Sequence, residues 1–362
     1  MYSFKTPDVN DALQRGIEHL LREGITETSR NGPVLVAPEP VCTEYTNPRA
    51  RVLLSPTRDA NPFFHFFEAL WFLTGDNAIE FPCYFNSGYG RYSDDDRTMW
   101  DAYGWRWRRF FGWDQLEAII AELRQHPDSR RCVLSMWNPA QWGEQAAPGW
   151  CTTARAVPST GGAPTYWTDW VGDFQVATHG GKAVPCNTHC YLDLRGGALN
   201  MTVCNRSNDA LFGCYGANMV HMSIMQEYMA MRLGVPLGVY RQFSNNLHVY
   251  TDVFSREKLE QIAHECDTLG RAPTAGPAIT SGFDEDLQVF MAWALRLIRE
   301  ADDDQSSDAL KTPFFTEVAR PMFDAWYWRK QGHIDAALSM VAEIEAPDWQ
   351  RACREWIERR KK

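Results

Sequence analysis

The stretch Val184-Pro185-Cys186-Asn187 stands directly before two runs of strand-forming residues, 189–194 and 198–205. The turn Arg195-Gly196-Gly197 lies between these runs and predicts a β-hairpin. A polar stretch, Asn205-Arg206-Ser207-Asn208-Asp209, follows the second run, and its arginine comes twenty residues after Cys186. The sequence therefore predicts a hairpin that has a cysteine before it and a group of polar residues after it.

Apolar residues with helical spacing surround this hairpin. A nearly continuous apolar run at 63–74 predicts a buried helix that ends at Gly75-Asp76. Amphipathic patterns predict helices at 8–24, 113–124 and 218–233. A short strand is expected at 132–137, and the prolines within 33–56 indicate extended segments and turns. Helices and strands mixed in this way predict an α/β fold in the broad sense, which includes α+β folds.

Two other parts of the chain have a different character. Residues 139–184 are rich in Gly, Pro, Thr and Trp and lack a helical period, which indicates an irregular insertion. Beyond residue 255 the pattern is mostly helical, with predicted helices at 258–269, 284–301, 314–331 and 334–344. An acidic linker is expected at 302–308. We therefore predict a domain at 1–254 that contains the insertion, and a helical C-terminal extension at 255–362.

The composition excludes several classes of protein. A chain of 362 residues with 44% apolar residues can bury a large core, and a net charge of −10 argues against a general nucleic-acid binder. The most apolar stretch, 63–73, is too short to span a bilayer, so no membrane association is expected. The ten cysteines form no CxxC pair and support no zinc site, so we expect reduced thiols, no metal and a cytoplasmic location.

A set of polar and aromatic motifs occurs in a fixed order along the chain. The motifs are Phe67–Asp76, Tyr103–Arg108, Asp128–Arg131, Ser135–Pro139, Pro185-Cys186, Asn205–Asp209, Gly213, Asn218 and Leu247–Tyr250. Over about 34–252, this order and content resemble the thymidylate synthase family, which includes the pyrimidine nucleotide hydroxymethylases. The resemblance implies a thymidylate synthase-like mixed β-sheet with flanking helices, and a catalytic role for residues 1–254.

Cys186 matches the nucleophile of that family. C5 of a uracil or cytosine ring reacts poorly as a nucleophile until a thiolate adds at C6 and turns C5 into an enolate or enamine carbon. Such a cysteine needs a lowered pKa, which cationic neighbours provide, and the resemblance implies that Arg206 is close. A buried, inert thiol is the usual state of a lone cysteine, but the ordered motifs favour the catalytic interpretation.

Five further residues are assigned to proton transfer and to the cofactor. Glu68 lies in an apolar helix, where a carboxyl group is costly unless it is partnered or has a raised pKa, and it matches the general acid/base of the family. Tyr103 matches a tyrosine that aids proton removal from C5, and Asp209 matches an aspartate that faces the folate. Gly213 and Trp100 are assigned to the same cofactor site, although a core role for Trp100 is equally open. The implied cofactor is 5,10-methylenetetrahydrofolate.

The remaining matches concern the nucleotide. The resemblance assigns the phosphate to Arg130, Arg131, Arg206 and Ser207. The paired arginines reach across from a second subunit in the family, which implies a homodimer. A further phosphate arginine is expected before Glu68, with Arg49, Arg51 and Arg58 as candidates. His248 and Tyr250 alternate along a predicted strand, so both point to one face, and the resemblance assigns them to the sugar.

Two departures from the family pattern leave the base and the product open. The base-reading position, Asn for uracil or Asp for cytosine, is Ala217 here, and a one-residue insertion within Cys214-Tyr215-Gly216 would bring Asn218 into its place. An asparagine reads uracil, and its flipped amide would serve cytosine. The chain also continues past the point where thymidylate synthases end in a short apolar tail that closes over the folate. A wetter site favours addition of water, and hence hydroxymethylation, over reduction to methyl.

We therefore expect a folate-dependent enzyme that transfers one carbon to C5 of a pyrimidine nucleoside monophosphate (dCMP, CMP or dUMP), with hydroxymethylation favoured. Reductive methylation of dUMP or dCMP is the alternative reaction. A catalytically silent relative that binds nucleotide or RNA is the alternative of another class. The helices at 255–362 have no assigned role, and a partner-docking module is one interpretation of them.

Overall fold

The computed structural model describes residues 1–138, 173, 181–269, 276–299 and 309–361. Their strands are β1 (Tyr2–Thr6), β2 (Ile25–Ser29), β3 (Gly32–Val36), β4 (Val41–Tyr45), β5 (Val133–Ser135), β6 (Asn187–Arg195), β7 (Ala198–Asn205), β8 (Asn208–Asp209), β9 (Leu237–Ser244) and β10 (Leu247–Tyr250). Their helices up to residue 254 are α1 (Val9–Glu23), α2 (Pro62–Thr74), α3 (Glu80–Phe85), the 3-10 helix η1 (Tyr89–Tyr92), α4 (Tyr103–Arg108), α5 (Gln115–Gln125), the π-helix η2 (Ala210–Ala217) and α7 (Asn218–Leu233).

The larger sheet has six strands in the order β1-β4-β9-β7-β6-β5. The predicted hairpin is its β6–β7 pair, which is antiparallel, whereas β7 and β9 run parallel, so the sheet is mixed as expected. Residues along β6 alternate in exposure, with Cys190 and Leu192 buried and Tyr191 48% exposed. The buried face packs against α7, whose Gln226 donates to the carbonyls of Leu199 and Val239. The mixed α/β fold is thus confirmed.

The smaller sheet has four strands in the order β2-β3-β10-β8. Strand β10 runs antiparallel to β3 and parallel to β8, which places His248 opposite Asp209. The β2–β3 hairpin pairs Ser29 with Gly32, so Arg30 and Asn31 form its tip. This sheet therefore brings the N-terminal hairpin to residues from the second half of the chain.

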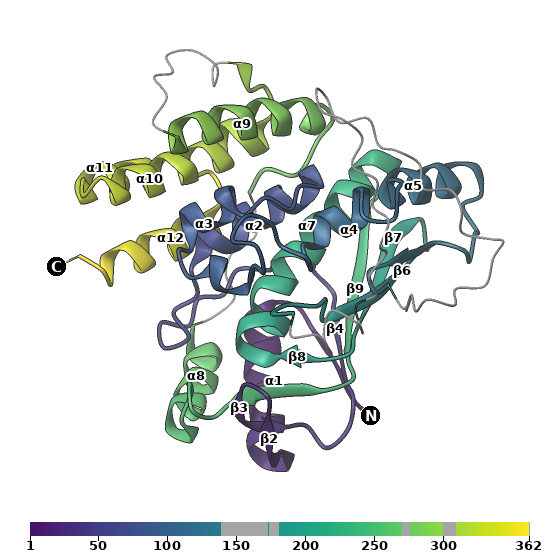
Figure 1. Cartoon of the computed structure of the whole chain (residues 1–362), viewed down its shortest axis with the longest axis vertical. Coiled ribbons are helices and arrows are strands. Elements are labelled where there is room, and N and C mark those ends of the chain that lie inside the picture. Colours follow the sequence, from purple (N-terminus) through teal and green to yellow (C-terminus); the bar gives the residue numbers. More distant parts are fainter. Residues whose placement is uncertain (139–172, 174–180, 270–275, 300–308, 362) are drawn as a thin grey trace.

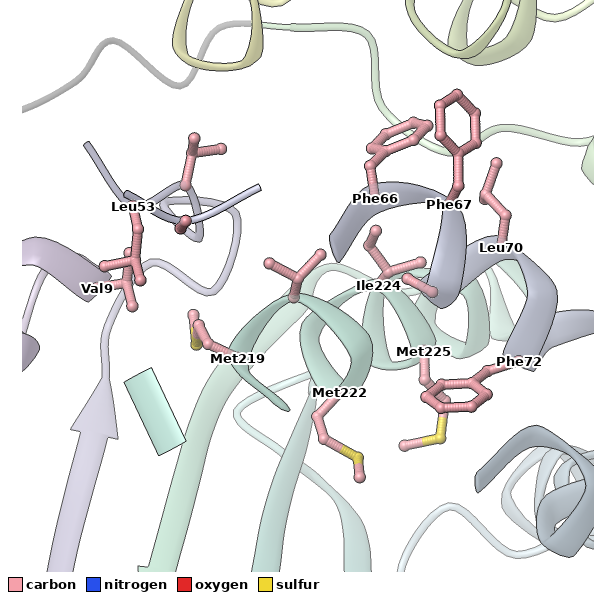
Figure 2. Packing of buried hydrophobic residues seen from close by; sticks show 14 of the residues in the cluster. Val9, Leu53, Phe66, Phe67, Leu70, Phe72, Met219, Met222, Ile224 and Met225 are labelled. Atoms are coloured by element: carbon pink, nitrogen blue, oxygen red, sulfur yellow. The ribbon is translucent and has the colours of Figure 1, made fainter. Parts of the chain in front are cut away.

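Helices α2 and α7 pack against each other in the centre of the molecule (Figure 2). The Asn61 side chain caps the first turn of α2, Pro62 suits its first position, and Gly75 ends it with φ of 72°. Phe66, Phe67 and the other apolar side chains of α2 are buried, as the unbroken apolar run predicts. Glu68 is buried with them.

The C-terminal part consists of the helices α8 (Arg256–Thr268), α9 (Phe283–Ile298), the π-helix η4 (Phe314–Ala319), α10 (Arg320–Lys330), α11 (Ile334–Ala342) and α12 (Pro347–Glu358). Helices α9, α10 and α12 contact α2, whereas α8 packs against α1 (Figure 1). The ring centroids of Phe66 and Trp349 are 5.1 Å apart, and those of Phe63 and Trp356 are 5.8 Å apart. One continuous apolar core therefore joins these helices to the rest of the chain.

Most predicted helices and strands agree with the structure to within a few residues. The helix α12 was not predicted, although its buried residues Trp349, Cys353 and Trp356 follow helical spacing. The structure also divides the predicted helix at 314–331 into η4 and α10. The predicted acidic linker at 302–308 lies outside the described residues, as does the predicted insertion except for Asp173 and 181–184.

Candidate active site

Cys186 directly precedes β6, at the open end of the β6–β7 hairpin. The backbone N–H of Arg206 donates to the carbonyl of Cys186 over 3.0 Å, which closes the open end of the hairpin. The Arg206 guanidinium then donates to the carbonyls of Pro185 and Val184 over 3.0 and 3.2 Å. The structure thus brings Cys186 and Arg206 together, as the resemblance implies.

The electrostatics of Cys186 differ from the expectation. Burial raises the pKa of the Cys186 thiol above its ordinary value, and the carboxylates of Asp101 and Asp209 add to this rise. Arg206 lowers the pKa, but it does not offset the other contributions. The expected lowering of the thiol pKa is therefore wrong for the single chain, because one arginine is outweighed by desolvation and two acidic neighbours.

Tyr103 and Asp101 lie next to Cys186. The ring of Tyr103 stacks on Phe72 at 5.4 Å, and its hydroxyl group interacts with the backbone N–H of Asn187. Burial, together with the negative charges of Cys186 and Asp101, raises the pKa of Tyr103 well above its ordinary value. Burial also raises the pKa of Asp101 to about 6. Sequence reasoning missed Asp101, although it follows Trp100 directly and stands two residues before Tyr103.

Glu68 is paired with a histidine that no sequence motif predicted. Its Oε2 lies 2.9 Å from Nε2 of His221, and the two side chains are 5% and 3% exposed. His221 is on α7, three residues after Asn218, so the pair joins α2 to α7. Tyr89 also interacts with Glu68, and burial together with the Glu68 charge raises the pKa of Tyr89.

An open cleft of about 1310 Å³ adjoins this group. Arg206, Ser207, His248 and Tyr250 all line the cleft, together with Val184 and Thr188 on either side of Cys186. The rings of His248 and Tyr250 lie edge to face at 5.3 Å, so the two side chains share one face of β10, as their alternation predicts. The structure therefore brings the predicted sugar and phosphate residues of one chain to one place.

Arg30, at the tip of the β2–β3 hairpin, lines the same cleft, and sequence reasoning missed it. The three arginines named as candidates lie elsewhere. Arg49 and Arg51 bind the carboxylate of Glu227 at 3.2 and 2.6 Å. Arg58 is buried, donates to the carbonyl of Leu211 and stacks on Phe212. None of the three lines the cleft, because buried carboxylates and carbonyls already hold them.

Arg130 and Arg131 are exposed and precede β5 at the edge of the larger sheet. They do not line the cleft of their own chain, although Val133 and Ser135 of β5 do. Their side chains have no salt bridge within the described residues. The structure therefore separates them from Arg206 within one chain.

Asp209 caps the π-helix η2 and keeps one oxygen atom free of hydrogen bonds. Its Oδ1 accepts from the backbone N–H groups of Leu211 and Phe212 over 2.7 and 2.6 Å. Its Oδ2 is buried and has no partner among the described residues. Burial raises the pKa of Asp209, and the hydrogen bonds from the two amides oppose this rise.

Asn218 begins α7, directly after η2. Its Nδ2 donates to Oδ1 of Asn208 over 3.1 Å, and Nδ2 of Asn208 donates to Oγ of Ser244 over 3.1 Å. Gly216 within η2 has φ of −104° and ψ of −116°, which is not helical. A π-type turn is how a helix absorbs an extra residue, so η2 fits the one-residue insertion expected before Asn218.

Gly213 and Trp100, the two other residues assigned to the cofactor, lie in different surroundings. A Cβ atom on Gly213 would lie 2.8 Å from Oδ1 of Asn208 and 3.2 Å from Nδ2 of Asn218, so this glycine makes room for the asparagine pair. Trp100 is partly exposed, and its indole N–H donates to Asp173 over 2.8 Å. Asp173 also binds the buried guanidinium of Arg106.

The described residues contain neither a membrane-spanning helix nor a cluster of metal ligands. None of their helices is long and apolar enough to cross a membrane. They also contain no group of three or more His, Cys, Asp or Glu side chains that could hold a metal ion.

Comparisons with known proteins agree with the motifs. A sequence model of the family described as thymidylate synthase matches residues 12–160 and 168–292. The chain is 38% identical to a deoxyuridylate hydroxymethyltransferase of Pseudomonas phage M6, over 100% of this chain and 95% of that protein. It is 29% identical to a protein of the same name from Bacillus phage SP01, over 72% and 62% of the two chains. A third protein of that name, from Delftia phage PhiW-14, is 28% identical over 67% and 60%.

Among solved structures, thymidylate synthase from T4 phage aligns with a TM-score of 0.49 and 17% identity, over 68% of this chain and 78% of that one. The family match covers more than half of the chain, and the relative from phage M6 is similar over its full length. The chain therefore belongs to the thymidylate synthase family.

Proposed function

We propose that this enzyme transfers a hydroxymethyl group to C5 of 2′-deoxyuridine 5′-monophosphate, with 5,10-methylenetetrahydrofolate as the one-carbon donor. The observation that carries the proposal is the position of Cys186. Asp101, Asp209 and Arg206 interact with its thiol, and its neighbours Val184 and Thr188 line a cleft that also contains Arg30 and Arg206. The names of the three phage relatives support the choice of a deoxyuridylate and of hydroxymethylation.

The cleft provides the groups that a nucleoside monophosphate requires. Arg30 and Arg206 are exposed guanidinium groups that line one cleft beside the Ser207 hydroxyl, and a phosphate dianion is recognised by such converging donors. His248 and Tyr250 offer an imidazole and a phenol to the sugar hydroxyl from one face of β10. With the phosphate at the arginines, the base would extend towards Cys186 and Asn218.

The reaction begins when Sγ of Cys186 bonds to C6 and C5 becomes an enolate carbon. After C5 has accepted the one-carbon unit, its proton is removed through Tyr103, whose hydroxyl lies beside the residue that follows Cys186. The raised pKa of Tyr103 keeps its proton in place, so it can pass a proton on but cannot store one. Glu68 and Asp101 are the carboxylates that interact with Tyr103, and they supply the acceptor.

The choice of uracil is supported by the amide of Asn218. One N–H of its Nδ2 donates to Asn208, which leaves a second N–H and Oδ1 for a ligand. A donor and an acceptor at these positions match O4 and N3–H of uracil. The same amide in a flipped orientation would match cytosine only if Asn208 also turned over.

The cofactor site is supported by Asp209. Its buried Oδ2 has no partner among the described residues, and a buried carboxylate oxygen without a donor is costly. An N–H of a pterin ring is a suitable donor for it, so the residues fit a folate. When bound, the folate supplies the one-carbon unit at the oxidation level of formaldehyde.

Hydroxymethylation rather than methylation is supported by the C-terminal part of the chain. None of the residues that line the cleft comes from positions after 250. Near the end of the chain, Arg359 and Arg360 are paired with Asp59. Among the described residues, those after 250 therefore add nothing to the lining of the cleft, which leaves it open to the water that hydroxymethylation requires.

A homodimer is supported by the open face of the larger sheet. Val133 and Tyr191 are 39% and 48% exposed on this face, which is unusual for large apolar side chains. Arg130 and Arg131 lie at the edge of the same face. A second copy packed there would bury the face and carry its arginines towards the cleft.

A panel of nucleotides tests the proposal. The protein is incubated with methylenetetrahydrofolate and, separately, with dUMP, dCMP, UMP and CMP, and the products are weighed by mass spectrometry. We expect the mass of a hydroxymethyl group to be gained on dUMP. A methyl group gained on dUMP, or a product from a cytosine nucleotide alone, would contradict the proposal.

A further inference from the structure

The buried pair Glu68–His221 is not explained by nucleotide binding or by folding alone. The two side chains come from different helices and meet at 2.9 Å in an otherwise apolar contact between α2 and α7. Both ring nitrogens of His221 are buried without a hydrogen bond among the described residues, so the imidazole is held by its ion-pair contact with Glu68 and by edge contact with Phe72 at 4.8 Å. Burying such a polar pair costs desolvation free energy, so its presence suggests a function.

Several titratable groups surround the pair. On the Glu68 side, Tyr89 of η1 and Tyr103 of α4 interact with the carboxyl group, as does Asp101 from the loop before α4. On the His221 side, His65 lies one turn before Glu68 on α2, and burial together with Arg58 and His221 lowers the pKa of His65 well below its ordinary value. Among the described residues, His221 is therefore the basic side chain in direct contact with the Glu68 carboxyl group.

We propose that His221 is a positioning residue that holds Glu68 as the proton acceptor for the water molecule that completes hydroxymethylation. This inference rests on the proposed function and extends it to the step that separates hydroxymethylation from methylation. The carboxylate oxygen of Glu68 lies within ion-pair distance of the imidazole Nε2, at 2.9 Å. The imidazole therefore fixes the orientation of the carboxyl group and takes up part of the charge change when Glu68 accepts a proton.

The step balances without any further reactant. Before it, the pyrimidine carries an exocyclic methylene group at C5 and the Cys186 thioether at C6. The water oxygen bonds to the methylene carbon while Glu68 takes a proton from the water. The electron pair of the methylene double bond moves to C5 and the C4 carbonyl, and its return forms the C5–C6 double bond and breaks the C6–S bond. The product is the 5-hydroxymethyl nucleotide, and Cys186 leaves as a thiolate.

The test separates this step from the earlier ones. With enzyme in excess over 5-tritiated dUMP, and with methylenetetrahydrofolate present, tritium release reports proton removal from C5, and chromatography reports hydroxymethyl product. Both rates are measured across pH for the wild type, for His221→Asn and for His221→Gln. His19→Asn is the matched control, because His19 is also buried with both ring nitrogens unpartnered, but it stacks on Tyr2 at 4.0 Å in a distant part of the fold.

We expect His221→Asn to lower the rate of product formation by about 10- to 100-fold, the range for loss of a residue that orients a functional group. Tritium release should fall much less, because Asp101 remains as a second acceptor for the C5 proton. His221→Gln retains a donor for Glu68 but cannot titrate, so it should recover part of the rate without the pH dependence of the wild type. His19→Asn should leave the ratio of the two rates and its pH profile unchanged.

Parallel loss of both rates with an unchanged pH profile would overturn the proposal, because a purely structural histidine would behave in that way. Unchanged rates in both His221 variants would overturn it as well. The proposed function fails separately, if the wild type releases tritium but makes no hydroxymethyl product. Circular dichroism confirms that each variant is folded, and the glutamine variant keeps the test valid if the asparagine variant is not.

Discussion

At the scale of the residue, the site combines a nucleophile with an acidic environment. Asp101 and Asp209 both raise the pKa of the Cys186 thiol, and Arg206 alone opposes them. A nucleotide phosphate would add more negative charge to the cleft. We infer that further positive charge is required when the substrate binds, and the exposed guanidinium groups of Arg30 and of a partner's Arg130 and Arg131 are suited to supply it.

The stability of the protein should depend on pH through Asp101. Burial raises the pKa of Asp101 to about 6, so the folded state binds its proton more tightly than the unfolded state does. A raised carboxyl pKa favours folding at low pH, and this contribution is lost as the pH rises through about 6. Asp101→Asn should therefore raise the free energy of unfolding relative to the wild type more at pH 8 than at pH 4. The expected difference is about 1–2 kcal/mol, allowing for partial exposure to solvent.

Urea unfolding of both proteins at the two pH values measures this difference. An Asp96→Asn variant is the control, because Asp96 is exposed. Equal effects of Asp101→Asn at both pH values would show that burial does not disfavour the ionised form of Asp101.

The sequence predicted some of these residues and missed others for a physical reason. Cys186 and Glu68 are surrounded by motifs whose order could be read directly. Arg30, Asp101 and His221 carry no local pattern of their own. Each becomes part of the site only when a hairpin tip, a loop or a neighbouring helix is placed in space, and sequence spacing does not report that placement.

At the scale of the element, the π-helix η2 sets the position of Asn218, the residue proposed to read the base. It connects Asp209, which caps its first turn, to Asn218, which begins α7. The missing family position at Ala217 predicted an extra residue here, and the non-helical Gly216 shows where the helix departs from regular geometry. The sequence did not predict the hydrogen bond between Asn218 and Asn208, because the two residues are ten positions apart on different elements.

Gly213→Ala tests the link between this element and the base. The added Cβ atom would press on Oδ1 of Asn208 at 2.8 Å and on Nδ2 of Asn218 at 3.2 Å, so the asparagine pair must shift. We expect KM for dUMP to rise about 10-fold, the effect of losing about 1.4 kcal/mol of binding, with a smaller change in thermal stability. Gly90→Ala is a control, because the atoms nearest to its added Cβ atom, Sγ of Cys83 and Cδ1 of Ile79, lie at an ordinary 3.7 Å.

Steady-state kinetics with dUMP give KM for each variant. An unchanged KM in Gly213→Ala, with the protein still folded, would mean that the Asn208–Asn218 pair does not read the base. A rise in KM for Gly90→Ala of the same size would indicate a general effect of added methyl groups.

At the scale of the whole molecule, α2 is packed between two groups of helices (Figure 1). Helix α7 covers one side of α2, and α9, α10 and α12 cover the other. The predicted division into residues 1–254 and 255–362 followed the change in sequence pattern. Because the apolar core continues across this division, we propose that the C-terminal helices brace the helix that carries Glu68. The sequence could not show this, since amphipathic patterns identify an apolar face but not its partner.

The proposed dimer can be tested by mixing two inactive variants. Cys186→Ala removes the nucleophile, and the double variant Arg130→Ala/Arg131→Ala removes the arginines proposed to act across the interface. If each site combines Cys186 of one subunit with the arginines of the other, hybrid dimers contain one intact site. The two variants, mixed under conditions that exchange subunits, should recover part of the wild-type rate of tritium release from 5-tritiated dUMP.

A mixture that is no more active than the sum of its parts, after subunit exchange is confirmed, would contradict a shared site. Sedimentation of the wild type as a monomer at assay concentration would contradict it as well. A control mixture of Cys186→Ala with Arg206→Ala should stay inactive, because one chain supplies both residues to a site and each hybrid site therefore lacks one of them.

The central claim is that Cys186 drives hydroxymethylation of dUMP, and one comparison tests it most directly. Wild type and Cys186→Ala are each incubated with dUMP and methylenetetrahydrofolate, and the nucleotide products are identified by mass spectrometry. We predict 5-hydroxymethyl-dUMP from the wild type and no product from Cys186→Ala, with both proteins folded. Formation of the same product by Cys186→Ala, or formation of thymidylate by the wild type, would contradict the claim.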